Sequence, residues 1–511
     1  MGTMRRTTDG DELARYLADE SRLSGSADEV AWPESPAEAA ELLRDAGARG
    51  VPVTVSGAGT GIVGGRVPAG GIVLATDRLT RVGEPRPLPG PGPVAAAVAV
   101  GAGVPLASLQ EAMAAAGFWY PPDPTEAGSF LGGNAATNAS GARTFRHGPT
   151  RAWVRRLAVV LADGTVLDLP RGRVRARDGA FGIPLPAGGV RRVPAPDWRL
   201  PATSKHAAGY WSEPGMDLVD LFIGSEGTLG VITGLELGLL PAPGGWVAGL
   251  LFFPGEERAL AFVERAREET LGPGPLAALA LEFFDGAVLD LLRDRGAGIP
   301  RDAAAAIFFE QEVARSGDEE EISGGWIALA DEAGALGDSW LAGGPSDLAR
   351  FREFRHLVPV AINEILARRG VRKVSTDTAV PRGRVGKLLR RVRRILGEED
   401  LESLAFGHVG NDHLHVNILP RDREEEDRAR AIYRRLVRAA VELGGTVSAE
   451  HGIGKRKLAD LELLYPPAVI DRMRAIKRAL DPGWILGRGT LLPPPSPPPG
   501  GRAPGSPGGG A

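Results

Sequence analysis

Three segments rich in glycine and other small residues lie within the first 242 residues, and they constrain the fold more than any other feature. The first is Ser56-Gly57-Ala58-Gly59-Thr60-Gly61, and the others span residues 128–148 and 223–233. Glycines at this density let backbone N–H groups converge on an anion without obstruction by Cβ atoms. One such loop suits either a nucleotide or a turn-rich connection, but three together predict a site for a long polyanionic ligand. The absence of a G-K-[ST] sequence argues against a phosphoryl-transferring NTPase.

Short strands and helices alternate as far as about residue 242, which indicates an α/β unit. Residues 36–49 are predicted to form a helix that Ser35 caps. The pair Asp163-Gly164 separates two predicted strands and is a strong hairpin signal.

The pattern changes after Pro241 and Pro243. Apolar runs predict strands that are separated by amphipathic helices, and this pattern indicates an α+β domain with an antiparallel sheet. The predicted strands are 246–253, 280–284, 304–312 and 414–419, and the clearest helices are 257–269 and 431–443. The final residues, 493–511, contain 14 Pro or Gly and are predicted to form a disordered tail.

The chain contains no cysteine, which excludes disulfides, thiolate nucleophiles and cysteine-ligated zinc or iron–sulfur clusters on this chain. A formal net charge of -4 argues against nucleic acid as the main partner. The first residues lack the apolar region of a signal peptide, and no apolar run reaches the length of a membrane span. We therefore expect a cytoplasmic protein.

Basic residues are distributed unevenly in two respects. Residues 382–396 form a predicted basic amphipathic helix, which suits docking to an anionic inner-membrane surface, binding to an acidic partner, or simply a solvated helix face. Among the 60 Lys plus Arg residues only six are lysines, a bias that a GC-rich coding sequence explains and that weakly favours a role for each lysine retained. These lysines are Lys205, Lys373, Lys387, Lys455, Lys457 and Lys477.

Four of the seven histidines lie between residues 408 and 451. His413, His415 and Asn417 are expected on one face of a strand, with His408 just before it and Glu450-His451 in a later glycine turn. Imidazoles and a carboxylate suit a divalent ion such as zinc, with manganese or iron as alternatives. Solvated histidines or a catalytic cluster are the other interpretations.

Several motifs in this order resemble the FAD-linked oxidases of vanillyl-alcohol oxidase type, in the branch of the glycolate oxidase flavoprotein subunit and the D-lactate and D-2-hydroxyglutarate dehydrogenases. They include YPPDP, GGNAATNASG, IGSEGTLGVIT, FGHVGNDHLHVNIL and SAEHGIG. The resemblance implies an α+β protein with a two-subdomain α/β FAD-binding domain of PCMH type and an α+β cap domain with an antiparallel sheet. It divides the chain into the FAD-binding domain (1–242), the substrate-binding cap (243–480), a return to the first domain (481–492) and the tail (493–511).

The same resemblance implies where FAD lies. The first loop would wrap the pyrophosphate, the second group would line the flavin, and the third would hold the nucleotide half. Thr60 stands where relatives often carry a histidine that binds FAD covalently, so noncovalent FAD is expected. Gly487-Arg488-Gly489 replaces an Asn-Pro-Gly that contacts the flavin in the family. The implied FAD residues are Ser56, Gly57, Ala58, Gly59, Thr60 and Gly61; Pro122, Asp123, Thr125, Gly132, Gly133, Asn134, Thr137 and Asn138; and Glu226, Gly230, Val231 and Ile232.

For the cap, the resemblance implies metal ligands at His408, His415 and Glu450, with His451 as general base. His413 stands where the family commonly has asparagine, and we interpret it as a strand histidine rather than an extra ligand. Three further residues are implied for the substrate: Arg355 for its carboxylate, and Asn417 and Lys373 as contacts.

The resulting hypothesis is FAD-dependent oxidation of a small 2-hydroxy acid of the D-lactate, glycolate or D-2-hydroxyglutarate class. A flavin-dependent transferase resembling alkyl-dihydroxyacetonephosphate synthase and a noncatalytic flavin-binding subunit are the alternatives. The expected partners are an electron-transfer or iron–sulfur protein and a second copy of the chain.

Overall fold

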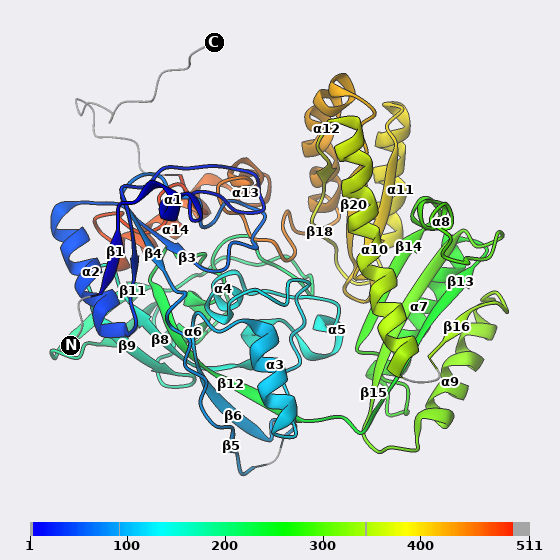
Figure 1. Ribbon diagram of the computed structural model, residues 1–511, viewed down its shortest axis with the longest axis horizontal. Coiled ribbons are helices and arrows are strands. Elements are labelled where there is room, and N and C mark those ends of the chain that lie inside the picture. The colour runs from blue at the N-terminus through cyan, green and yellow to red at the C-terminus, as the bar shows by residue number, and fades with distance from the viewer. Residues whose placement is uncertain (1–3, 91, 343–344, 494–511) are drawn as a thin grey trace.

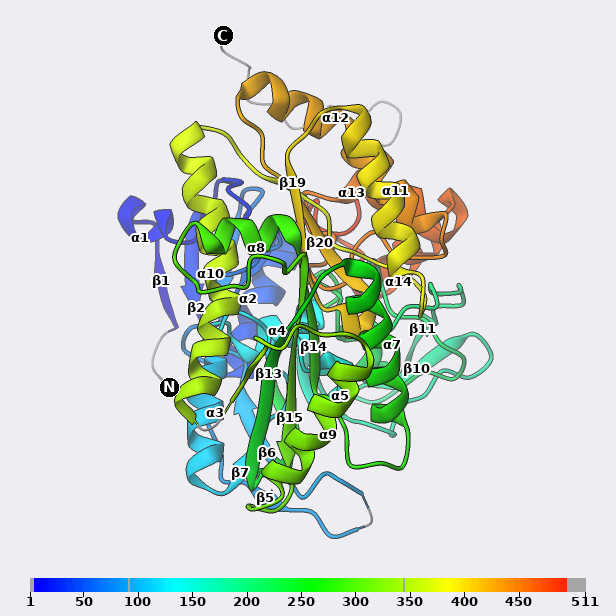
Figure 2. The same cartoon turned by 90° about the vertical axis from the view of Figure 1, so that its right-hand side faces the viewer.

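The computed structural model describes residues 4–90, 92–342 and 345–493, arranged as two bodies that meet along one side (Figures 1 and 2). The first body holds the N-terminal half of the chain together with its C-terminal end, and the second is the cap. The chain crosses between them where β12 (Val231–Pro241) leads into β13 (Gly245–Phe253). Apart from Pro493, the predicted tail lies outside the described residues.

The first subdomain is a small mixed sheet with the strand order β1-β2-β4-β3. Strand β4 pairs in parallel with both β2 and β3, as the alternating pattern predicts. The predicted helix at 36–49 is confirmed as α2, because the Ser35 side chain accepts from the Glu38 N–H and Gly50 ends the helix at φ 66°. The elements are β1 (Arg5–Thr7), α1 (Gly10–Ala14), β2 (Glu29–Trp32), α2 (Pro36–Arg49), β3 (Val53–Ser56) and β4 (Ile72–Ala75).

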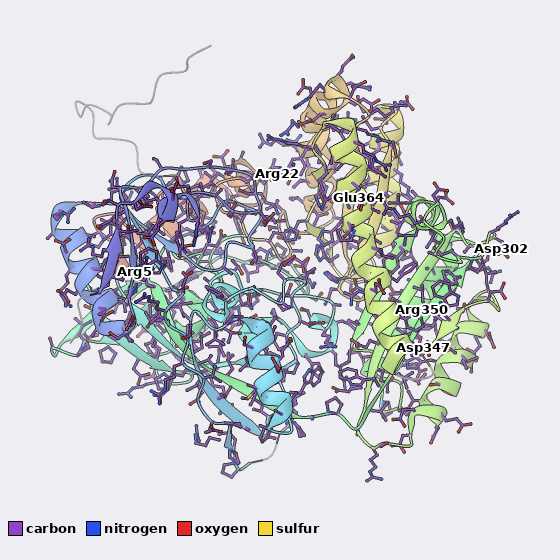
Figure 3. All side chains as sticks on the ribbon, in the orientation of Figure 1. Arg5, Arg22, Asp302, Asp347, Arg350 and Glu364 are labelled. Atoms are coloured by element: carbon purple, nitrogen blue, oxygen red, sulfur yellow. The ribbon has the colours of Figure 1, made fainter. Side chains whose placement is uncertain are left out.

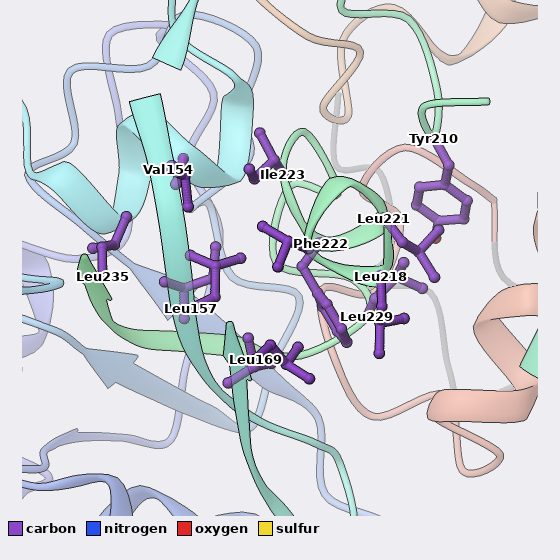
Figure 4. Packing of buried hydrophobic residues seen from close by; sticks show 14 of the residues in the cluster. Val154, Leu157, Leu169, Tyr210, Leu218, Leu221, Phe222, Ile223, Leu229 and Leu235 are labelled. Carbon is purple, nitrogen blue, oxygen red and sulfur yellow. The ribbon is translucent and has the colours of Figure 1, made fainter. Parts of the chain in front are cut away.

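The second subdomain is built on an antiparallel sheet of order β5-β6-β12-β8-β9, with β7 also pairing with β12. Asp163-Gly164 forms the predicted hairpin turn between β8 and β9. Leu157 and Leu169 of this hairpin pack against Phe222 of α6 in the core shown in Figure 4. The elements are β5 (Arg86–Pro87), β6 (Ala96–Gly101), α3 (Leu106–Ala115), β7 (Phe118–Trp119), α4 (Leu131–Thr137), α5 (Thr144–His147), η1 (Thr150–Trp153), β8 (Val154–Val160), β9 (Val166–Pro170), β10 (Ala180–Pro184), β11 (Val190–Pro194) and α6 (Leu218–Phe222).

The cap is an antiparallel sheet of order β16-β13-β15-β14-β19-β20-β17, with β18 also pairing with β20. Alternate residues of β13 enter different hydrophobic clusters, Leu251 and Phe253 on one face and Leu250 and Phe252 on the other. The predicted antiparallel sheet is therefore confirmed, and helices cover both of its faces. The elements are α7 (Glu256–Leu271), β14 (Ala280–Asp285), α8 (Gly286–Arg293), β15 (Ala305–Val313), α9 (Glu319–Glu332), β16 (Trp340–Leu341), α10 (Pro345–Arg369), β17 (Val374–Ser375), β18 (Thr378–Ala379), α11 (Val385–Glu398), β19 (Ser403–Gly407), η2 (Val409–Asn411), β20 (His413–Ile418) and α12 (Arg423–Val441).

The long cap helices are amphipathic. Arg350 and Glu364 project from the exposed side of α10 (Figure 3), whereas Phe354 and Ile362 of the same helix are buried in the cap. The predicted basic helix is confirmed as α11, whose Leu388, Leu389, Val392 and Leu396 face the core. Within the described part of the chain, no helix is both long and apolar enough to cross a membrane.

The return to the first domain begins earlier than residue 481. Helices α13 (Leu458–Leu464) and α14 (Pro467–Leu480) follow the cap in sequence, yet Met473, Ile476 and Leu480 pack into the core of the first domain. The predicted cap boundary at residue 480 therefore differs from the packing, because α14 buries its apolar face against the first domain. Beyond it, Val53 of β3 donates its backbone N–H to the Ile485 carbonyl over 2.8 Å.

Lys477 anchors this return segment. Its ammonium is almost wholly buried and donates to Asp481 Oδ2 at 2.8 Å, to the Thr228 carbonyl at 2.8 Å and to the Leu486 carbonyl at 3.0 Å. All three ammonium hydrogens can therefore be satisfied, which offsets the cost of burying the charge.

We expect Lys477→Met to lower the free energy of unfolding by about 3–5 kcal/mol, because Asp481 would be left as a buried, unpaired charge. Chemical denaturation should show this loss. Lys387→Met on the exposed side of α11 is the matched control and should stay close to the wild type. Equal midpoints for the two variants would contradict the anchoring role.

Candidate functional site

The three predicted FAD loops converge in the first domain. The Phe130 side chain lies 4.0 Å from where a Cβ on Gly57 would sit, and the Val55 side chain lies 3.6 Å from the corresponding position on Gly227. The Glu226 N–H donates to the Ala136 carbonyl over 2.8 Å, which ties the third loop to the second. Segments from three distant parts of the sequence thus border one another.

The first loop offers free hydrogen-bond donors. None of the backbone N–H groups of residues 57–61 donates a hydrogen bond to another described residue. A Cβ added to Gly61 or Gly65 would meet no atom within 4 Å, so space lies beside this backbone. A run of unpaired amides on a glycine-rich backbone fits the pyrophosphate of FAD.

The second group of predicted FAD residues is tightly packed. A Cβ on Gly132 would lie 2.5 Å from the Ala102 Cβ, so only glycine allows α4 to approach the residue that follows β6 this closely. Asn138 adopts φ 51° and its Oδ1 accepts from the Arg151 N–H at 3.0 Å. Thr125 is exposed at the rim, whereas Pro122, Asn134 and Asn138 are buried. Their contacts with FAD stay predictions.

The third group divides in two. Gly230, Val231 and Ile232 lie at the start of β12 and are buried in the core. The Glu226 carboxylate is also buried, but it accepts from the backbone N–H groups of Ile453 at 2.9 Å and Gly454 at 2.7 Å. Burial raises the pKa of Glu226 to about 7. Its observed partner is therefore the turn that carries Glu450 and His451.

The predicted histidine cluster is assembled around Glu450. Its Oε1 lies 3.4 Å from His408 Nε2, 3.3 Å from His415 Nε2 and 3.7 Å from His451 Nε2. His413 Nδ1 lies 3.9 Å from the other oxygen, Oε2. The alternation predicted for this strand holds, because Leu414 and Val416 of β20 are buried in the cap core on the opposite face.

Hydrogen bonds orient the two predicted histidine ligands in the same way. His408 Nδ1 lies 2.7 Å from Glu282 Oε1, and His415 Nδ1 lies 3.3 Å from the Thr376 carbonyl oxygen. Since both partners are acceptors, each Nδ1 carries a proton, and each Nε2 is the ring atom that faces Glu450. Two imidazole nitrogens and a carboxylate oxygen thus converge on one point, and this donor set fits a divalent metal ion.

Burial and nearby charges favour the unprotonated forms of Glu450, His413 and His415, but not of His408. Burial alone would raise the pKa of Glu450, but Lys205 and the nearby histidines hold it well below its ordinary value. Burial lowers the pKa of His415 and brings that of His413 to about 3, so both rings are neutral at pH 7. At His408 burial acts in the same direction, but the charges of Glu282 and Glu450 outweigh it and raise the pKa.

Asp377 is a site residue that sequence reasoning missed. Its Oδ2 lies 3.1 Å from His451 Nδ1 and accepts from Lys457 Nζ at 2.8 Å, while Oδ1 lies 3.0 Å from His413 Nε2. Despite burial, the charges of His451 and Lys457 hold the pKa of Asp377 well below its ordinary value. A carboxylate thus orients the predicted general base. A single acidic residue in the otherwise uncharged sequence TDTAVP was the available signal.

Lys205 and Glu282 were also missed. The Lys205 side chain is fully buried, and its Nζ donates to Glu450 Oε2 over 2.9 Å. Glu282 contacts His408, and the charges of His408 and Arg355 bring its pKa to about 2 in spite of burial. The only sequence signal for Lys205 was that a lysine is retained in an arginine-rich chain. No sequence signal pointed to Glu282.

The predicted substrate residues are only partly brought together. Arg355 of α10 places a guanidinium nitrogen 3.7 Å from Glu282 Oε2 and stacks over Phe308, so it borders the cluster. Asn417 shares the face of His413 and His415 on β20, and its Nδ2 donates to the His415 carbonyl over 3.3 Å. Lys373 is exposed and forms no ion pair among the described residues.

Two segments of the chain match known domain families. Residues 27–170 match the family of FAD binding domains, and residues 246–491 match the C-terminal domain of FAD linked oxidases. The chain therefore belongs to the FAD-linked oxidase family, which confirms the resemblance seen in the sequence.

Relatives of known name span nearly the whole chain. A D-lactate dehydrogenase of Anaerostipes hadrus is 30% identical, covering 95% of this chain and 94% of its own length. The glycolate oxidase subunit GlcD of Bacillus subtilis is 28% identical over 91% of this chain and 89% of its own. A D-2-hydroxyglutarate dehydrogenase of Stutzerimonas stutzeri is 27% identical over 95% of each chain. A solved alkyldihydroxyacetonephosphate synthase shares the fold, with a TM-score of 0.65 and 15% identity over 94% of this chain and 81% of that chain.

We expect metal analysis of the purified protein to find about one divalent ion per chain. His408→Ala and His415→Ala should each lose the ion but keep FAD, because the ligands lie on cap elements while the FAD loops lie in the first domain. Elemental analysis and the flavin absorption spectrum measure the two separately. A wild-type protein without metal, active in the presence of a chelator, would contradict the metal site.

Proposed function

We propose that this protein oxidises a D-2-hydroxy acid, of the D-lactate, glycolate or D-2-hydroxyglutarate class, to the 2-keto acid. The observation that carries the proposal is the position of a single turn. It presents Glu450 and His451 to the histidine cluster, and its next residues are held by Glu226 of the third FAD loop. A metal ligand and a candidate base are therefore attached directly to the flavin-binding unit.

When bound, FAD supplies a hydride acceptor and the divalent ion supplies a Lewis acid for the substrate hydroxyl. His451 is suited to take the hydroxyl proton at Nε2, because Asp377 holds its Nδ1 at 3.1 Å. Its side chain is 26% exposed, against 0% to 13% for the other three histidines of the cluster, so it is the one a substrate reaches most easily.

The carboxylate of a 2-hydroxy acid requires a cation beside the reacting carbon. Arg355 borders the cluster through Glu282, and a guanidinium binds a carboxylate with two parallel hydrogen bonds. Asn417 adds an amide on the same strand face as His415. These groups would hold the substrate with its hydroxyl towards His451.

The similar sequences favour oxidation over the alternatives. Those named above are dehydrogenases or an oxidase subunit at 27–30% identity, whereas the synthase likeness rests on fold at 15% identity. A noncatalytic flavin-binding subunit would not need an oriented histidine–aspartate pair beside a metal site. We keep a cytoplasmic location and an electron-accepting partner as parts of the proposal, and any iron–sulfur relay would belong to that partner because this chain has no cysteine.

Anaerobic addition of D-lactate, glycolate or D-2-hydroxyglutarate should bleach the flavin absorption of the purified protein with at least one of the three. Acid precipitation should release the FAD into solution, since Thr60 offers no ring nitrogen for a covalent bond. Flavin that stays oxidised with the whole panel, yet is reduced by dithionite, would contradict the proposed function.

We expect His451→Asn to slow anaerobic flavin reduction by about 10²–10⁴-fold while FAD and metal contents stay normal, because only the proton acceptor is lost. Stopped-flow absorption measures the rate, and Lys387→Met, an exposed residue of α11 outside both the cluster and the FAD loops, is the control. Loss of metal in His451→Asn would make the residue a ligand, and a near-normal rate would indicate a structural role.

Arg355→Lys should raise KM more than it lowers kcat. Lysine keeps the positive charge but cannot form two parallel hydrogen bonds, so binding weakens in the ground state and the transition state alike. Steady-state kinetics with the best substrate measures both constants. An unchanged KM would remove Arg355 from the substrate site.

A further inference from the structure

We propose that His413 is a fourth protein ligand of the metal ion, so that this chain holds the ion with three imidazoles and the Glu450 carboxylate. The proposal rests on the metal centre described above and adds to it a ligand that the sequence assigned to the strand alone. The family resemblance implies asparagine at this position, whereas this chain has histidine.

The His413 ring is buried without hydrogen-bond partners in the described part of the chain. Its side chain is 0% exposed, yet neither ring nitrogen has a hydrogen-bond partner among the described residues. Asp377 Oδ1 lies 3.0 Å from Nε2, but outside hydrogen-bonding geometry. Within the ranges that the structure describes, Nδ1 in particular is a buried polar atom without a partner, which native structures seldom leave. Bulk water cannot supply the missing partner, because the side chain is 0% exposed.

His413 Nδ1 lies on the side of the ring that faces Glu450. With Nε2 close to Asp377, Nδ1 is left on the side of Glu450, 3.9 Å from its Oε2. His408 and His415 present their Nε2 atoms to Oε1 of the same carboxylate at 3.4 and 3.3 Å. One ligand atom from each of the four residues can be chosen so that all lie within 4.8 Å of one another. One ion between them would satisfy all of these lone pairs together.

The His413 ring packs against the rings of both predicted histidine ligands. The His413 ring centre lies 4.5 Å from that of His415 and 5.3 Å from that of His408, so the three imidazoles are in contact. His415 Nε2 and His413 Nδ1 both face the Glu450 carboxylate, and a metal ion between them would be a partner for all three groups. Lys205 and Ser140 approach Glu450 Oε2, at 2.9 and 3.1 Å, but neither is a hydrogen-bond partner of His413.

A fourth protein ligand changes what the ion can do. Zinc with four protein ligands is tetrahedral and closed, as in structural sites, and leaves no position for a substrate. A substrate hydroxyl could reach the ion only if it accepts five or six ligands, which is ordinary for manganese or iron. Direct contact between the substrate and the ion would therefore require manganese, iron, or zinc expanded to five ligands.

The test replaces the native ion of the full-length protein with Co²⁺ after chelation. Affinity is measured by competition with a chromophoric chelator, and coordination by the visible d–d bands. We expect His413→Asn to weaken Co²⁺ binding at least about tenfold and to change these bands, since loss of even an outer partner of a ligand costs about 10–100-fold. His147→Asn is the matched control, because His147 also has a buried Nε2 without a hydrogen bond but lies between Trp119 and Trp153, outside the cluster.

X-ray absorption counts the imidazoles bound to Co²⁺ in the wild type and in His451→Asn, so a His413→Asn protein that fails to fold leaves the answer intact. Three imidazoles in both proteins support the proposal, because the second count excludes His451 as the third ring. Two imidazoles, or unchanged affinity and bands in His413→Asn, overturn the role of His413 while the metal centre stands. A wild type that binds no Co²⁺ overturns the metal centre and His413 with it. Flavin reduction by a hydroxy acid, measured separately, reports on the proposed function.

Discussion

The contact between Glu226 and the backbone of Ile453 and Gly454 is the interaction on which the site depends. It joins the third FAD loop to a turn that lies more than two hundred residues later in the sequence. Both glycines of the turn have positive φ, 82° at Gly452 and 53° at Gly454, and a Cβ on Gly454 would lie 2.1 Å from the Val63 carbonyl oxygen. The turn can therefore be held against the FAD loops only with glycine there, and its position sets where Glu450 and His451 lie.

Charge balance makes the buried cluster tenable. Three buried carboxylates, those of Glu282, Asp377 and Glu450, each face a cation: Arg355, Lys457 and Lys205 respectively. Burying any of these carboxylates alone would favour its neutral form. With the cations in place, all three pKa values fall below the ordinary range, so the carboxylates can orient histidines or bind a metal.

The few lysines of this arginine-rich chain divide into buried and exposed residues. Of the six in this arginine-rich chain, Lys205, Lys457 and Lys477 are buried and each donates to a carboxylate. A compact ammonium with rotatable donors fits a confined site better than a planar guanidinium. Lys387, in contrast, is exposed on α11, and Lys373 is exposed although the family resemblance implied a substrate role for it. Scarcity alone therefore does not distinguish a buried lysine from a surface one.

The sequence by itself determined the local elements and the residues with the clearest chemistry. Helix α2, the hairpin at Asp163-Gly164 and the strand face that carries His413 and His415 follow from capping, turn chemistry and periodicity. The grouping of His408, His415 and Glu450 follows from motifs that resemble those of a known family. These signals are short-range, since each depends on residues a few positions apart or on a motif read as a unit. Tertiary structure alone decided the rest. It placed α14 in the first domain, because its apolar face finds its partner there, and it brought Asp377, Glu282 and Lys205 to the cluster from three separate segments. A single carboxylate or ammonium has no periodicity to reveal it, and its role appears only when burial forces it to find an opposite charge.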